Sequence, residues 1–154
     1  MAVFDIDGVV ADVRHRLHHL ERRRKDWDGF FAAAAQDTLL DPGRRLVEEL
    51  STRHEIVWLT GRPERIRRLT RDWLGRHGLP VGELLMRRDV DRRPAPAYKL
   101  AALRRRPAGT VAAFVDDDDE VVSAALAAGY PAVLADWVVR TPILRQAQDD
   151  EGRS

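Results

Sequence analysis

The chain has 154 residues, of which 44% are hydrophobic and 33% charged, a balance typical of one globular domain with a sizeable core. No apolar run is long enough to cross a bilayer, no signal peptide is expected because Asp5 and Asp7 interrupt the apolar start, and the absence of cysteine excludes disulfides and thiolate metal sites. The formal net charge of +1 does not indicate a nucleic-acid binder, and we expect a cytoplasmic protein without membrane partners.

Five short apolar segments alternate with helical segments along the chain. This alternation predicts an α/β domain with a mostly parallel sheet over residues 1–140. The expected strands are Ala2–Ile6, Glu55–Leu59, Glu83–Met86, Val111–Val115 and Ala132–Leu134. Helices are expected from Asp41, the cap before Pro42, to Arg53, from Pro63 to Gly78, over 97–105 and over 120–128. The polar tail, 141–154, is expected to be disordered or loosely docked.

The first strand ends in the sequence Asp5-Ile6-Asp7-Gly8. Residues two apart on a strand point the same way, so the two carboxylates would repel each other. A divalent cation or a shared proton would relieve that repulsion. The alternative is an ordinary Asp-Gly turn at a strand end.

A long insertion, 11–51, follows this strand and is expected to be mainly helical. In an open α/β sheet such insertions lie over the ligand crevice, so it predicts a small cap. Its aromatic residues, Trp27, Phe30 and Phe31, could stack on bases, although packing of the insertion onto the core is favoured. Three histidines at helical spacing are more typical of solvated or packing side chains than of a zinc site; they are His15, His18 and His19.

The second strand leads into Thr60-Gly61-Arg62-Pro63. A hydroxyl and backbone N–H groups at the start of a helix form a natural phosphate cradle, to which Arg62 could add a bidentate contact. The alternative is an ordinary connection between a strand and a helix.

The loop after the third strand carries Arg87, Arg88, Arg92 and Arg93 and leads to Lys99, one of two lysines in the chain. A lysine before a helix is usually a solvated surface group, but this position after a proline-rich loop indicates a function.

The fourth strand ends in four aspartates, 116–119. Asp116 and Asp117 would meet the Asp5 pair at the carboxyl edge of the sheet, and such clustered oxygens favour Mg²⁺. Asp118 and Asp119 are expected to be surface or capping groups.

The motifs Asp5-x-Asp7-Gly8, Thr60, Lys99 and Asp116-Asp117 resemble, in order and spacing, those of the haloacid dehalogenase (HAD) superfamily. The resemblance implies a parallel five-stranded sheet of order 5-4-1-2-3, flanked by helices. It implies Asp5 as nucleophile and Asp7 as general acid and base, with Thr60 and Lys99 holding the phosphate. Mg²⁺ would be held by Asp5, the Asp7 carbonyl and Asp117, with Asp116 close by.

Four segments are further similar to the 3′-phosphatase domain of phage-type polynucleotide kinase/phosphatase. They are Val3–Arg16, Asp26-Trp27 to Phe30, Leu59–Pro63 and Met86–Lys99. That family has arginines at the positions of Arg16 and Arg62, which together with Gly61 are expected to bind substrate. Ala95 stands where the family has an acidic residue, and the chain has no P-loop for a kinase.

The resemblance therefore implies a Mg²⁺-dependent phosphomonoester hydrolase that acts through an aspartyl-phosphate on 3′-phosphates of nucleic-acid ends or nucleotides. Two alternatives remain open. One is a small-metabolite or 5′-nucleotide phosphatase, and the other is a non-catalytic binding module that keeps the HAD fold.

Overall fold

The computed structural model of the chain describes residues 1–107 and 109–139. The polar tail expected over residues 141–154 lies outside these described residues. None of the described helices is long and apolar enough to cross a membrane.

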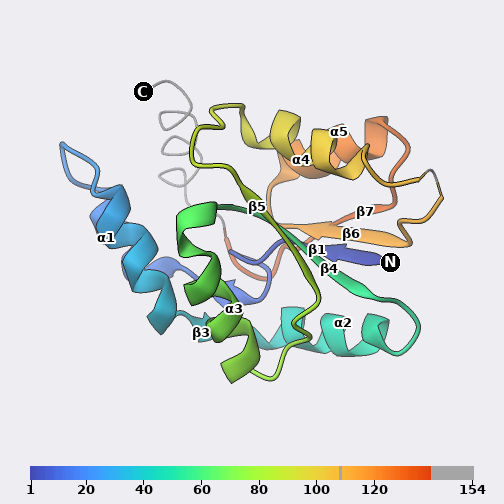
Figure 1. Cartoon of the computed structure of the whole chain (residues 1–154), viewed down its shortest axis with the longest axis horizontal. Coiled ribbons are helices and arrows are strands. Elements are labelled where there is room, and N and C mark those ends of the chain that lie inside the picture. Colours follow the sequence, from blue (N-terminus) through green and yellow to red (C-terminus); the bar gives the residue numbers. More distant parts are fainter. Residues whose placement is uncertain (108, 140–154) are drawn as a thin grey trace.

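The main sheet has five parallel strands in the order β5-β4-β1-β6-β7 (Figure 1). Their bounds are β1 Ala2–Phe4, β4 Ile56–Pro63, β5 Glu83–Arg87, β6 Ala113–Asp116 and β7 Ala132–Leu134. The expected order, 5-4-1-2-3, counted only these five strands and corresponds to β7-β6-β1-β4-β5, so it is confirmed. Because β1 pairs with both β4 and β6, the segments that follow these three strands meet at one edge of the sheet.

Helices cover both faces of this sheet (Figure 1). One face carries α2 Asp41–Ser51 and α3 Arg67–Arg76, and the other carries α4 Ala95–Leu103 and α5 Asp119–Ala127. The alternation of side chains along β1 fills both cores: Phe4 packs with Trp58 and Trp73 on the α2–α3 side, whereas Val3 packs with Phe114 on the α4–α5 side. Burial on both faces explains why β1 and the first half of β4 are apolar throughout.

The cap, residues 11–40, precedes α2. It contains β2 Ala11–Asp12, the 3₁₀ helix η1 Arg14–His19, α1 Trp27–Ala32, the 3₁₀ helix η2 Ala33–Gln36 and β3 Thr38–Leu39. The expected helical character holds for η1, α1 and η2, but the antiparallel pairing of β2 with β3 was not expected. The cap has a small apolar core of its own, built on Leu17, Leu20, Phe30 and Phe31. The last part of the expected insertion, α2, covers the sheet.

The helix boundaries differ from those expected chiefly at the N-termini. β4 extends to Pro63, whose ψ of 150° is extended and which pairs with Arg87 of β5. The 3₁₀ helix η3, Glu64–Ile66, follows, and α3 begins only at Arg67. The expected helix N-terminus at Pro63 was therefore wrong, because the fixed φ of proline suits an edge of a strand as well as the first turn of a helix. α4 begins two residues earlier than expected and contains Lys99, and Leu40 takes the N-cap position expected for Asp41.

Candidate active site

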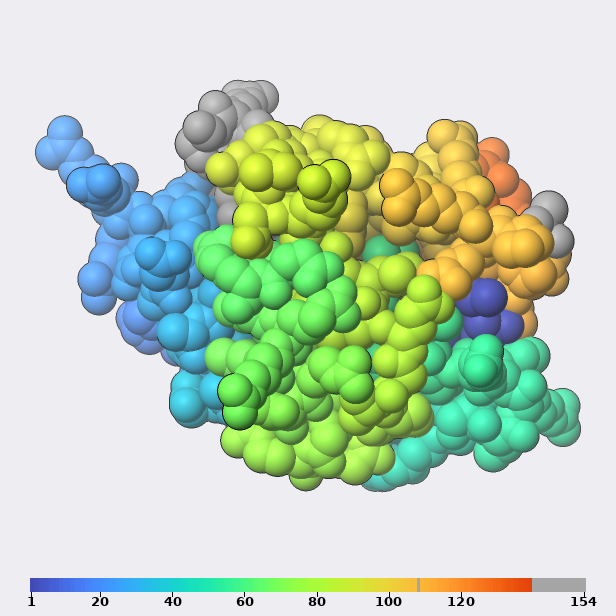
Figure 2. Space-filling model, viewed as in Figure 1, coloured from blue at the N-terminus to red at the C-terminus, as the bar shows by residue number. Residues whose placement is uncertain are grey.

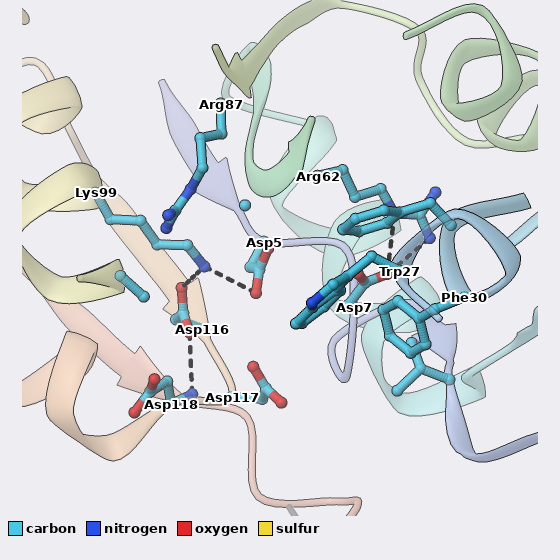
Figure 3. Close-up of a pocket in the computed structure, with 14 residues that line it drawn as sticks. Asp5, Asp7, Trp27, Phe30, Arg62, Arg87, Lys99, Asp116, Asp117 and Asp118 are labelled. Atoms are coloured by element: carbon cyan, nitrogen blue, oxygen red, sulfur yellow. Dashed lines mark hydrogen bonds and ion pairs between the residues drawn. The ribbon is translucent and has the colours of Figure 1, made fainter. Parts of the chain in front are cut away.

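A small pocket of about 50 Å³ lies where β1, β4 and β6 end (Figure 3). The sheet supplies Asp5, Asp7, Gly61, Arg62 and the aspartates that follow β6. α4 supplies Lys99, and the cap covers the other side with Trp27, Phe30 and Phe31. The fold thus brings the four widely separated sequence motifs to one place.

Lys99 lies between two buried carboxylates. Its Nζ is 2.9 Å from Asp5 Oδ2 and 2.5 Å from Asp116 Oδ2. The pKa of Asp5 is raised to about 7: burial raises it most, Lys99 lowers it, and Asp116 and Asp7 add to the rise. Burial would lower the pKa of Lys99, but the two carboxylates outweigh it and raise this pKa above its usual range. Lys99 therefore remains a cation and fixes one oxygen of Asp5.

Three aspartates could hold a cation. Asp5, Asp116 and Asp117 each offer one carboxylate oxygen, and these oxygens lie within 4.8 Å of one another. No other group of this kind occurs among the described residues. Three carboxylates against one ammonium leave a formal charge of −2, which a divalent ion would neutralise, and oxygen ligands are those that Mg²⁺ prefers.

The two aspartates after β6 differ in their surroundings. Asp116 is fully buried, and its second oxygen, Oδ1, accepts the backbone N–H of Asp118 at 2.9 Å. Asp117 points into the pocket instead (Figure 3). Gly8, with φ of +76°, makes room for it, since a Cβ at position 8 would lie 2.1 Å from Asp117 Oδ2. Asp118 caps α5 as expected, accepting the N–H of Glu120 at 3.0 Å, but it is buried and not a surface residue.

Asp7 is held by two buried arginines. Its Oδ1 accepts hydrogen bonds from Arg62 Nη2 at 2.7 Å, Arg62 Nε at 3.0 Å and Arg16 Nη2 at 3.0 Å. Burial would raise the pKa of Asp7, but Arg62 and then Arg16 outweigh it, so the pKa lies below its usual value. Arg16 and Arg62, the arginines predicted to bind substrate, are 0% and 1% exposed. Both contact carboxylates, and of the two only Arg62 lines the pocket.

A residue that sequence reasoning missed completes this cluster. Asp37, which follows η2, is 2% exposed and accepts hydrogen bonds from Arg16 Nε at 2.8 Å, Arg16 Nη2 at 2.9 Å and Arg62 Nη2 at 3.0 Å. His15 Nε2 lies 2.7 Å from Asp37 Oδ1, which leaves His15 in a hydrogen bond and outside any group of metal ligands found in the described residues. Two guanidinium groups and two carboxylates make a neutral buried cluster that orients Asp7.

Thr60 is 1% exposed and does not line the pocket. Its Oγ1 accepts the backbone N–H of Arg62 at 3.1 Å, and its carbonyl accepts the Tyr98 hydroxyl at 3.0 Å. Gly61, the next residue, is part of the pocket wall. The segment in which a phosphate cradle was expected is therefore extended and contains no helix N-terminus.

The far walls of the pocket come from the cap and from the end of β5. Trp27 stacks on Phe31 at 5.7 Å and meets the edge of Phe30 at 5.8 Å, so the aromatic residues pack together as favoured and also line the pocket. Arg87 lies over the Tyr98 ring at 4.8 Å. Its buried Nε has no hydrogen-bond partner among the described residues, and it reaches the pocket (Figure 3).

Comparisons with known proteins agree with this geometry. Residues 1–133 match a family described as the polynucleotide kinase PNKP phosphatase domain. No match was found among curated proteins. Similar structures include a Pnkp1/Rnl/Hen1 complex (21% identity, TM-score 0.71, 86% of this chain and 44% of that chain). A putative β-phosphoglucomutase from Thermotoga maritima is also similar (16% identity, TM-score 0.58, 99% of this chain and 96% of that chain). A class C acid phosphatase from Bacillus anthracis is similar as well (14% identity, TM-score 0.61, 99% of this chain and 76% of that chain). The chain thus spans less than half the length of the Pnkp1 complex chain that it matches.

Proposed function

Since the chain belongs to the family of polynucleotide kinase PNKP phosphatase domains and is a phosphatase of the HAD superfamily, we propose that it removes 3′-phosphates from nucleic-acid ends with the help of Mg²⁺. The observation that carries this proposal is the placement of Asp5. It lies between the cation of Lys99 and the carboxylates of Asp116 and Asp117 at the floor of an open pocket.

In the proposed reaction the Asp5 carboxylate attacks phosphorus, and the bond to the sugar oxygen breaks. Asp7 gives its proton to that oxygen as it leaves. Asp7 then takes a proton from water, whose oxygen attacks the phosphorus of the aspartyl-phosphate. Inorganic phosphate leaves and Asp5 is again a carboxylate, while the proton that Asp7 took from water passes to the departing phosphate or to solvent, which returns Asp7 to its anion. Lys99 holds Asp5 in place and stabilises negative charge on the phosphoryl oxygens.

Arg16 and Arg62 set the protonation state of Asp7 before substrate binds. Because Arg62 and Arg16 favour its anion, Asp7 must gain a proton with the substrate. A phosphate monoester has a second pKa of about 6 and can bring that proton itself. The same two arginines stabilise the anion that accepts a proton from water in the second step, and they keep its orientation fixed.

The residues present fit a magnesium ion. Asp5, Asp117 and the Asp7 carbonyl would hold it, with Asp116 beside them. When bound, Mg²⁺ neutralises repulsion between the nucleophile and the phosphate and stabilises charge as the leaving bond breaks.

The substrate assignment rests on the family and on the walls of the pocket. Trp27 offers an aromatic face for a terminal base, and Arg87 offers a cation for a neighbouring phosphate. One of the similar structures is titled as an RNA repair complex, at 23% identity and covering 41% of that chain. An RNA 3′-phosphate is therefore the first substrate to test.

The test is a screen for phosphate release with Mg²⁺. It compares RNA and DNA oligonucleotides that carry a 3′- or a 5′-phosphate with mononucleotides, sugar phosphates and p-nitrophenyl phosphate, with Asp5→Asn as the inactive control. We expect the 3′-phosphorylated oligonucleotides to react fastest. Equal rates on 3′- and 5′-phosphates, with no gain from a second nucleotide, would indicate a general phosphatase. No turnover of any substrate would leave a binding module.

A further inference from the structure

A second concavity lies between the cap and α3, next to the active site. It is an open groove of about 980 Å³. In Figure 2 the blue surface of the cap adjoins the green surface of α3. Apolar side chains form much of its lining: Phe31, Ala32, Ala35, Ile66 and Leu69. Four arginines also line it: Arg65, Arg68, Arg71 and Arg76.

The groove begins at the wall of the active-site pocket. Phe31 lines both cavities. On the pocket side Phe31 stacks with Trp27, and on the groove side the guanidinium of Arg65 lies 5.1 Å from its ring centroid. Trp27, Phe31 and Arg65 therefore form a row of side chains in contact that runs from the active-site pocket into the groove.

The charge of the groove favours an anionic occupant. Four guanidinium groups and the carboxylates of Asp28 and Asp72 line it, which leaves a formal charge of +2. The Arg68 side chain is 97% exposed. Its Nε lies 3.9 Å from Asp72 Oδ2, a distance too long for a strong ion pair. Arg71 makes no side-chain hydrogen bond or ion pair within the described ranges 1–107 and 109–139. Arginines on an exposed helix are ordinarily solvated, but here they border an apolar surface continuous with a phosphatase site.

We propose that this groove binds the single-stranded part of the substrate that leads away from the scissile phosphate, an inference that rests on the proposed function. Bases lie on the apolar floor, and backbone phosphates contact Arg68 and Arg71, since Arg65 is already paired with Asp28 and Asp89. Since base faces and phosphates are common to DNA and RNA, the groove binds both with little sequence preference. An acidic protein segment would fit the charge as well, but the continuity through Phe31 favours the strand.

The test is equilibrium binding in the Asp5→Asn background, so that turnover does not interfere. Fluorescence anisotropy follows labelled 3′-phosphorylated single strands, from a dinucleotide to about 12 nucleotides, a length within the usual range of single-strand sites. Arg68→Ala/Arg71→Ala removes two cations from the groove. Arg104→Ala/Arg105→Ala is the matched control, because it removes two exposed arginines from the end of α4 on the opposite face of the sheet.

The groove variant should bind the longest strand about tenfold more weakly, from two exposed ion pairs, and the loss should grow with strand length. The dependence of log Kd on log salt should flatten by about 1.4, from about 0.7 for each lost phosphate contact. The control should bind like the parent protein.

Two outcomes separate this inference from the proposed function. If the wild type releases 3′-phosphate but the groove variant binds long strands as well as its control does, the groove inference is overturned. If the wild type turns over no phosphomonoester while the groove variant still loses strand binding, the proposed function fails and the groove assignment stands.

Discussion

Replacing Asp37 with alanine should destabilise the domain strongly, although Asp37 lies outside the active-site pocket. Its carboxylate accepts three hydrogen bonds from Arg16 and Arg62, which are almost completely buried. Without it, two guanidinium groups share the single carboxylate of Asp7. The cluster changes from neutral to a formal charge of +1. The buried Nε of Arg16 loses its carboxylate acceptor, and Nη2 of Arg16 retains only Asp7.

The size of the effect follows from this geometry. Removing one partner of a buried ion pair costs about 3–5 kcal/mol, because the remaining charge is left desolvated and uncompensated. Domains of this kind have a total free energy of unfolding of only about 5–15 kcal/mol. At roughly 2–4 °C per kcal/mol for a domain of this length, the thermal midpoint should fall by roughly 6–20 °C. Asp37→Asn should lie between this variant and the wild type, because one amide oxygen can still accept.

The assay is thermal and urea unfolding followed by circular dichroism. Asp72→Ala serves as the control, because Asp72 is exposed on α3 and its ion pair with Arg68 is long, at 3.9 Å. The unfolding midpoint of this variant should match that of the wild type. If Asp37→Ala unfolds within about 1 kcal/mol of the wild type, well short of the loss typical of buried pairs, then Arg16 and Arg62 do not depend on this counterion and our reading of the cluster is wrong.

The remaining predictions concern the reaction. Asp5→Asn should abolish phosphate release with an unchanged circular dichroism spectrum, since an amide cannot attack phosphorus; turnover by a pure sample would refute the covalent mechanism. Activity should need Mg²⁺ or Mn²⁺, vanish with EDTA and be inhibited by Ca²⁺. The Mg²⁺ affinity measured by titration calorimetry should fall about tenfold per pH unit below about 7, because the ion competes with the proton that the raised pKa of Asp5 retains; a flat profile would contradict this. Asp117→Ala should raise the Mg²⁺ concentration needed for half-maximal rate far more than Asp119→Ala, and equal effects would mean that Asp117 is no ligand. Lys99→Ala should lose activity on every phosphomonoester, including p-nitrophenyl phosphate, and an unchanged rate would show that its contacts with Asp5 and Asp116 are structural.

The grouping of carboxylates at the floor of the pocket could be predicted because it depends on strand ends. Asp5 follows β1, and Asp116 ends β6, which pairs directly with β1. Parallel strands place their carboxyl ends at one edge of the sheet, so a linear pattern of apolar runs and carboxylates was enough to bring these residues together. Lys99 could be found for a different reason: the chain has only two lysines, which made its position conspicuous.

Asp37 could not be found in this way, because its role depends on the three-dimensional placement of other residues. It follows a 3₁₀ helix and precedes a strand of only two residues, so no periodicity marks it. The one available signal was the balance of charge between the arginines at positions 16 and 62 and the single carboxylate of Asp7. Two arginines buried beside Asp7 need a second anion, and the cap contains several aspartates that could supply it.

The short strands of the cap and the end of β4 were missed for related reasons. β2 and β3 have two residues each, too few for alternation to appear. Pro63 is compatible with a strand end and with a first helical turn, and pairing with Arg87 decides between them. Because β4 remains extended there, Gly61 and Arg62 reach the pocket from a strand, and Arg62 can turn toward Asp7.

The arginines show most clearly what the fold adds to the composition. Arg62 and Arg68 are six residues apart, yet one is 1% exposed and bound to two aspartates, while the other is almost fully exposed at the edge of an apolar groove. A buried, paired guanidinium has no charge to spare for an incoming phosphate, whereas a solvated one gains by replacing water and counterions with a phosphate. Affinity for a long strand should therefore come from the arginines along α3, and the state of Asp7 from the buried pair, so the two functions can be changed independently.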